Sequence, residues 1–346
     1  MTASIGDVAA RAGVSVATVS RALRGLPNVA PSTRARVLAA ASDLQYVVDP
    51  HASRLAAGKT RTMGMIVPLF TQWFFTQVVS GAEAVLAASG YDVLLYNVGS
   101  PTSRERVLTD LSFRKRVDGV IVIDLPLTEE QERRLERLDL PVVLVGIPSV
   151  RFPNVTIDNL MAARTATRHL VNLGHEHIGL ISGMPDDPLR FRAPLERRTG
   201  YRQVLMEAGL EVRDELDVPG NFSMRGGAEA MAQLLGVEHP PSAVFAESDE
   251  MAIGALKTVR DAGLRVPDDV SIVGFDDHEV AEYVGLTTVS QPVSDQGEVA
   301  AGLLLDRVQA DQEASPPSVV LPTKLVVRTT TGPRRGARSG QLTRFG

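Results

Sequence analysis

From residue 63 onward, short apolar runs alternate with longer segments of helical periodicity. Runs such as VDGVIVIDL and PVVLVGI have the length and β-branched content of strands buried on both faces, and segments such as TQVVSGAEAVLAASG have the spacing of helices. The alternation occurs twice, first up to PVVLVGI and again from HIGLISG to VSIVGFD. The pattern predicts two doubly wound α/β lobes with parallel sheets, and neither carries the G-x-G-x-x-G turn of a dinucleotide site.

The first sixty residues instead predict three short helices. The first begins with the capping-box pattern Ser4-x-x-Asp7 and ends at Gly13, and Ser15 is placed to cap a second helix, VATVSRAL. A third helix, PSTRARVLAAASDLQY, is expected to be capped at Ser32 and to close the small core. The residues of this helix that are expected to pack into that core are Val37, Leu38 and Leu44. Two helices joined by a Gly-containing turn are typical of a helix-turn-helix; another kind of three-helix domain is the alternative.

Charge is distributed unevenly between these parts. Residues 1–60 contain seven basic and three acidic residues, a net charge of +4, whereas the whole chain carries −5 and the remainder therefore −9. A basic module on an acidic body favours DNA binding by the N-terminal segment. The chain has no cysteine, which excludes disulfides and thiolate sites and favours a cytoplasmic location. It has no run of 18 apolar residues and no signal peptide, so no membrane partner is expected.

The segments DVAARAGVSVATVSRAL and STRARVLAAASDLQYVVDPHASRLAAGKTRTMGMIVP resemble the N-terminus of the LacI/GalR family of bacterial transcriptional regulators. The resemblance implies that Val16, Ala17 and Arg21 lie in the major groove of an operator. Arginine can bind guanine in bidentate fashion, and the two apolar residues can contact a thymine methyl or, alternatively, pack in the protein core. Ser15, Thr18 and Ser20 suit phosphate contacts or helix capping.

The stretch SRLAAGKT, residues 53–60, ends like a nucleotide-binding phosphate loop, but position 53 is Ser where that loop needs Gly. The resemblance implies a hinge that becomes helical on DNA. Leu55 would then wedge into the minor groove, while Arg54 and Lys59 would contact the DNA backbone. The role of His51 is left open.

The resemblance also implies a plan for the whole chain. Its segments are a helix-turn-helix domain at 1–47, a hinge at 48–60, a two-lobed effector domain similar to periplasmic sugar-binding proteins at 61–332, and a basic disordered tail at 333–346. Within the effector domain, lobe one comprises about 61–159 and 291–315, and lobe two about 160–290 and 320–332. Three crossovers join the lobes.

Small ligands of such folds bind between the lobes, where the carboxyl ends of the strands face a cleft. The resemblance implies apolar contacts from Phe75 and Phe222 and polar contacts from Arg198, Ser248, Asp249 and Asp276, with Asp124 and Asp158 as further candidates. Charged forks can bind vicinal hydroxyls, and aromatic faces can cover the C–H surface of a sugar. As alternatives, Asp249 and Asp276 could cap helices, and Phe75 could belong to the core. The places of Trp73 and of the 185–195 loop are left open.

The sequence therefore predicts a ligand-responsive transcriptional repressor that binds a pseudo-palindromic DNA operator as a homodimer. The effector is expected to be a sugar or sugar derivative. A nucleobase or nucleoside co-repressor is the alternative within the family, and a solute-binding protein is the alternative outside it. No enzymatic activity, cofactor or metal is expected, because G-x-S-x-G and H-E-x-x-H are missing. His175 and His177, two residues apart before a strand, would point to opposite faces.

Overall fold

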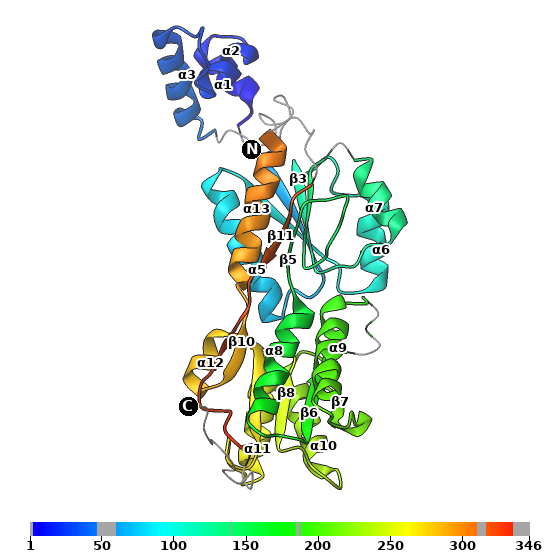
Figure 1. Cartoon of the computed structure of the whole chain (residues 1–346). Coiled ribbons are helices and arrows are strands. Elements are labelled where there is room, and N and C mark those ends of the chain that lie inside the picture. The colour runs from blue at the N-terminus through cyan, green and yellow to red at the C-terminus, as the bar shows by residue number, and fades with distance from the viewer. Residues whose placement is uncertain are drawn as a thin grey trace, which may run out of the picture. The chain divides into compact units, whose positions relative to one another are not determined.

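The computed structural model describes residues 3–46, 60–138, 140–184, 187, 189–309 and 316–334. The chain divides into two compact units, Met1–Arg61 and Thr62–Gly346 (Figure 1). In the described ranges, no helix combines the length and the apolar character that a bilayer span requires.

The N-terminal unit consists of three helices, α1 (Ile5–Ala12), α2 (Val16–Leu23) and α3 (Pro31–Asp43). The predicted capping box is confirmed, because the Ser4 side chain accepts a hydrogen bond from the Asp7 N–H while Asp7 accepts one from the Ser4 N–H. Gly13 ends α1 with a φ of 65°, a left-handed conformation that favours glycine. Ser15 caps α2 as expected.

Two details of the third helix differ from the sequence prediction. Helix α3 begins at Pro31 after Ala30, so Ser32 lies inside the helix and does not cap it. Proline suits the first helical position because its missing N–H would have no intrahelical partner there. Leu38 is 51% exposed, whereas Val37 is fully buried and packs with Val19 in the small core.

Lobe one is built on a parallel sheet of six strands in the order β11-β5-β4-β3-β1-β2. In chain order its elements are β1 (Thr62–Val67), α5 (Trp73–Ala88), β2 (Asp92–Asn97), α6 (Pro101–Asp110), β3 (Gly119–Ile123), α7 (Glu129–Glu136), β4 (Val142–Val145), β5 (Asn154–Ile157), α13 (Val293–Gln309) and β11 (Ser318–Leu321).

Lobe two has the sheet order β12-β10-β9-β8-β6-β7, in which only the pairing of β12 with β10 is antiparallel. Its elements are α8 (Asn159–Asn172), β6 (Ile178–Ser182), α9 (Arg192–Glu207), a short 3₁₀ helix (Asp214–Leu216), β7 (Asp217–Pro219), α10 (Met224–Gly236), β8 (Ala243–Ala246), α11 (Asp249–Asp261), β9 (Ser271–Asp276), α12 (Glu279–Val284), β10 (Thr287–Ser290) and β12 (Lys324–Val326). The predicted two-lobed α/β class is confirmed.

The chain passes between the lobes after β5, after β10 and after β11 (Figure 1). The last crossover falls later than expected, because Ser318–Leu321 pairs with β5 of lobe one although lobe two was predicted to resume at about residue 320. The disordered tail was predicted to begin at residue 333, but Arg334 still contacts the body. The Arg334 N–H donates to the Leu173 carbonyl, and the Arg334 guanidinium pairs with Glu176 at 2.5 Å.

Helices α5 and α13 of lobe one cross at two glycines. A Cβ at Gly81 would lie 2.1 Å from the Ser294 carbonyl oxygen, and a Cβ at Gly297 would lie 2.0 Å from the Val78 carbonyl oxygen. Because backbone atoms occupy those positions, neither contact can be relieved by turning a side chain. The close packing of these two helices therefore depends on glycine.

We expect Gly297→Ala to destabilise lobe one by about 1–3 kcal/mol, the usual cost of overpacking. Gly302→Ala on the same helix is the matched control, because no atom lies within 4 Å of its added methyl group. The control should be neutral or stabilising by up to about 1 kcal/mol, through helix propensity. Denaturant unfolding of both variants checks the prediction, and equal effects would contradict it.

Candidate functional site

One face of α2 in the N-terminal unit presents the residues predicted to read DNA. Val16 is 48% exposed, and Ala17 and Arg21 are also exposed. None of the three belongs to the buried core of the unit, so the alternative that Val16 and Ala17 pack inside it is wrong. This leaves a short apolar and cationic surface available to a partner.

The hydroxyl residues of α2 have local partners. Ser15 Oγ accepts a hydrogen bond from the Thr18 N–H at 3.2 Å and lies 2.9 Å from Thr18 Oγ1, so this pair stabilises the start of the helix. The Ser20 carbonyl accepts from Arg24 Nε at 3.1 Å. The predicted hinge residues Arg54, Leu55 and Lys59, and also His51, lie outside the described residues.

A cavity lies between the two lobes of the body, at the carboxyl ends of their strands. It has a volume of about 590 Å³, counting the part that opens to solvent. Asp124 follows β3, Gly146 follows β4, Ile157 ends β5 and Asp276 ends β9. The cavity is lined by Gln72, Phe74, Phe75, Asp124, Gly146, Ile157, Asn159, Phe191, Ala193, Pro194, Arg197, Phe222, Asp276, Gln291 and Gln296.

Arg197 is the central polar group of this cavity and is only 6% exposed. Its Nε donates to Asn159 Oδ1 at 2.9 Å, and its Nη1 donates to the Glu247 carbonyl oxygen at 2.5 Å. The guanidinium carbon lies 3.6 Å from the centre of the Phe275 ring, within range of a cation–π contact. These contacts fix the arginine plane while the cavity beside it stays open.

Two carboxyl groups in the cavity come from opposite lobes. Burial raises the pKa of Asp124 in lobe one to about 7, against the opposing effect of the Arg197 charge. Burial likewise raises the pKa of Asp276 in lobe two to about 7, again opposed by Arg197. Near neutral pH each group can therefore accept hydrogen bonds as a carboxylate or donate one as an acid. Such a set can bind hydroxyl groups, which need both donors and acceptors.

Asp276 is also held by a chain of amides. Its Oδ1 accepts from Gln291 Nε2 at 2.6 Å, and Gln291 Oε1 accepts from Gln296 Nε2 at 3.0 Å. Asp276 has a φ of 116°, which is unusual for a residue other than glycine. The helix that follows is capped by His278, so the alternative that Asp276 caps it is wrong.

Four aromatic rings supply much of the apolar lining. Phe74 and Phe75 come from α5, Phe191 precedes α9, and Phe222 precedes α10. The Phe75 and Phe191 ring centres lie 6.0 Å apart. Phe191 and Leu189, from the loop left open by sequence analysis, are buried in the hydrophobic cluster of lobe one. Phe75 is both a cavity and a core residue, so its two predicted roles coexist.

Several predicted cleft residues do not line the cavity. Arg198 Nε pairs with Asp217, whose side chain is 5% exposed. A residue one step along a helix is rotated by about 100°, which turns Arg198 away from the face that Arg197 occupies. Asp158 is exposed and caps α8 by accepting from the Met161 N–H at 2.9 Å. These two expectations are corrected.

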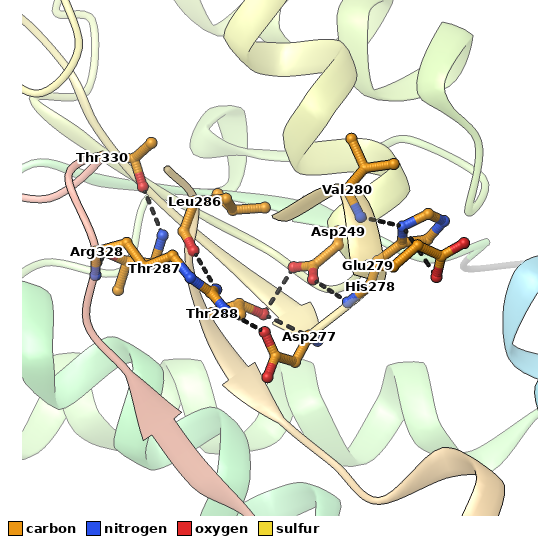
Figure 2. Close-up of polar contacts among 10 residues, drawn as sticks. All are labelled: Asp249, Asp277, His278, Glu279, Val280, Leu286, Thr287, Thr288, Arg328 and Thr330. Carbon is orange, nitrogen blue, oxygen red and sulfur yellow. Dashed lines mark hydrogen bonds and ion pairs between the residues drawn. The ribbon is translucent and has the colours of Figure 1, made fainter. Parts of the chain in front are cut away.

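Ser248 and Asp249 are likewise not in the cavity lining. Ser248 caps α11 by accepting from the Met251 N–H at 3.3 Å. Asp249 is completely buried, and its carboxylate accepts from the His278 N–H at 2.8 Å and from Thr288 Oγ1 at 2.7 Å (Figure 2). It therefore joins α11 to the β9–β10 region of lobe two and is not the helix cap proposed as its alternative.

Sequence reasoning missed Arg197, and a signal for it was present. The buried residues of α9 follow a three-to-four spacing that includes Pro194, Arg197, Tyr201 and Val204. Extending the apolar periodicity of Tyr201 and Val204 backwards reaches Arg197 and excludes Arg198. The other residues missed are cavity-lining amides and rings, namely Gln72, Phe74, Asn159, Phe191, Gln291 and Gln296.

The site and fold together define a class of protein: a helix-turn-helix unit followed by a two-lobed ligand-binding body. Comparison with known sequences identifies it further. The chain belongs to the LacI family of bacterial regulatory proteins, whose DNA-binding part matches residues 4–49, and a periplasmic binding protein-like domain matches residues 167–331. The predicted identity as a transcriptional regulator, and not an enzyme, is confirmed.

Three relatives show how far the similarity extends. Catabolite control protein A of Priestia megaterium is 37% identical over 336 residues, which cover 96% of this chain and 100% of that protein. A solved Lac repressor dimer bound to operator and the anti-inducer ONPF has a TM-score of 0.82 at 27% identity, covering 96% of this chain and 100% of that one. A complex of the transcriptional regulator CelR with cellobiose has a TM-score of 0.69 at 35% identity, covering 95% and 99%.

A buried carboxyl group beside the cavity makes stability depend on pH. Glu247 is fully buried, its Oε2 accepts from the Gly183 N–H at 2.8 Å, and its Oε1 has no hydrogen-bond partner among the described residues. Burial raises the pKa of Glu247 from 4.5 to about 8. Between these two pH values the folded state retains a proton that the unfolded state has lost, so the free energy of unfolding falls as pH rises.

We therefore expect Glu247→Gln to flatten the loss of stability between about pH 5 and pH 8, because the amide cannot lose a proton there. The group's contribution to the slope is at most about 1.4 kcal/mol per pH unit. Chemical denaturation at several pH values measures it, and exposed Glu238→Gln serves as the control. A wild-type slope in the Glu247 variant would refute the assignment.

Proposed function

We propose that the protein is a cytoplasmic transcriptional repressor that binds a pseudo-palindromic operator as a homodimer and responds to a small ligand in the cleft. The observation that carries the ligand part is the buried Arg197, placed between carboxyl groups of the two lobes with open volume beside it. A buried charge is costly unless it is paired, and this one lies at the wall of a cavity between the two lobes.

The chemistry of the cavity favours a sugar or sugar derivative. Arg197, Asp124 and Asp276 offer donors and acceptors for hydroxyl groups, and the phenylalanine rings offer faces for the C–H surface of a pyranose. The cellobiose complex of the CelR relative supports the same ligand class. A nucleoside is the second candidate, because four phenylalanines surround the cavity and could stack on a base.

For the DNA, we propose that Val16, Ala17 and Arg21 of α2 contact base edges in the major groove, with Ser15, Thr18 and Ser20 near the phosphates. Val16, Ala17 and Arg21 are all exposed on the N-terminal unit, which supports this role. Leu55, Arg54 and Lys59 of the hinge would complete the contacts in the minor groove and along the DNA backbone. A homodimer would match the two half-sites of the operator with one two-fold axis.

Arg21→Ala should weaken binding to the cognate operator by about 1–3 kcal/mol and relax specificity at one base pair. Binding selection from randomised DNA with purified protein measures both effects. Arg11→Ala is the control, because Arg11 pairs with Asp43 at 3.2 Å. An unchanged sequence preference in the Arg21 variant would remove Arg21 from the base-reading set.

A thermal-shift screen against sugars, sugar phosphates and nucleosides tests the cleft. A ligand at one hundred times its dissociation constant should add about 2.7 kcal/mol to the stability of the wild type. Arg197→Ala and Asp276→Ala should abolish the shift, whereas the neighbouring Arg198→Ala should keep it, because Arg198 is outside the cavity lining. If Arg198→Ala alone abolished the shift, the assignment of the cavity would be wrong.

A further inference from the structure

Trp73, the single tryptophan of the chain, lies at the first position of α5 in lobe one and contacts lobe two. Its indole Nε1 donates to Glu279 Oε2 at 2.6 Å. Its ring centre lies 4.7 Å from that of His278, with 33° between the planes. One residue of lobe one thus makes two different contacts with lobe two.

On the lobe-two side of this contact, hydrogen bonds hold His278 in place (Figure 2). The His278 N–H donates to buried Asp249, and His278 Nδ1 accepts from the Val280 N–H at 3.0 Å, which fixes the imidazole ring. The same Asp249 accepts from Thr288 on β10. Burial lowers the pKa of His278, so the ring that faces Trp73 is neutral at physiological pH.

The turn below these residues is supported as well. Asp277 has a φ of 60° and forms an ion pair with Arg328 at 2.7 Å (Figure 2). Arg328 Nη1 also donates to the Leu286 carbonyl at 2.8 Å. Two adjacent residues with positive φ, Asp276 and Asp277, thus connect the end of β9 to the residues that meet Trp73. Positive φ at a residue other than glycine persists only where the surroundings hold it, so these contacts fix the turn.

The contact lies beside the cavity on both lobes. Gln72 and Phe74, the neighbours of Trp73, both line the cavity, and Asp276 lines it two residues before His278. A ligand that binds Asp276 would therefore act on the same turn that carries His278 and Glu279. Trp73, His278 and Glu279 are not themselves among the residues that line the cavity.

We propose that Trp73, His278 and Glu279 form a clasp that holds the two lobes closed over the effector, and that the 276–279 turn couples effector contact at Asp276 to closure. The inference rests on the proposed ligand-binding function of the cleft. Trp73 is in this sense a positioning residue, because it acts through the relative placement of the lobes. A closed state stabilised in this way raises the fraction of protein that is competent to hold ligand.

Acrylamide quenching of tryptophan fluorescence in the full chain, without ligand or DNA, tests the clasp. When the excitation wavelength is one that tyrosine does not absorb, the emission comes from Trp73, so the signal needs no correction for other tryptophans. Glu279→Ala should raise the quenching constant at least twofold, and Glu279→Gln, which keeps an acceptor oxygen, should give an intermediate value. Glu282→Ala is the matched control, because Glu282 is exposed on the same helix.

Small-angle X-ray scattering of the same samples provides a readout that a local loss of shielding would not move. Glu279→Ala should increase the radius of gyration, and Glu282→Ala should leave it at the wild-type value. Wild-type quenching in Glu279→Ala, or equal increases in both alanine variants, would overturn the clasp. Because neither measurement uses ligand or operator, a failure of the proposed function would appear separately, in the thermal-shift and operator experiments.

Discussion

The burial of one positive charge, that of Arg197, organises the ligand-binding body. Removing a guanidinium from water costs several kcal/mol unless hydrogen bonds and opposite charges replace the water. Here the replacement comes from Asn159, the Glu247 carbonyl, the Phe275 face and the carboxyl groups of Asp124 and Asp276. Asp124 belongs to lobe one and Asp276 to lobe two, so carboxyl groups of both lobes act on this one buried charge.

The contacts between the lobes also include two groups of hydrogen bonds among the described residues. Trp73 of lobe one meets His278 and Glu279 of lobe two. Elsewhere, the Arg104 guanidinium of α6 donates to the carbonyl groups of Pro126 in lobe one and Leu189 in the segment leading to α9. Arg104 contacts Leu189 through the Leu189 carbonyl oxygen, whereas the Leu189 side chain packs into the core of lobe one. Three crossovers connect the same two lobes.

The architecture could be predicted from the sequence because it depends on repeated patterns. The periodicity of apolar residues predicted the strands and helices of the two lobes. The capping box at Ser4 and the glycine at position 13 predicted the bounds of the first helix. Single positions were harder. Leu38 was expected in the core because it is apolar, although it lies on the exposed side of α3. Arg198 stands beside Arg197, which lines the cavity, and Asp249 stands beside Ser248, which caps a helix. A shift of one residue changes the direction of a side chain completely. Contacts such as Trp73 with Glu279 join positions about two hundred residues apart, which no local pattern reveals.

The position of β11 has a consequence for biosynthesis. The first sheet needs Ser318–Leu321 beside β5, and helix α13 must pack on α5, yet α13 begins about 140 residues and β11 about 160 residues after the end of β5. At roughly 5–20 residues per second, the interval is on the order of 10–30 s. During that time lobe one lacks a covering helix, and the outer edge of β5 has no partner strand. The nascent chain would thus expose an open sheet edge and an apolar helix face while lobe two is still being made, a window in which a chaperone would be most useful.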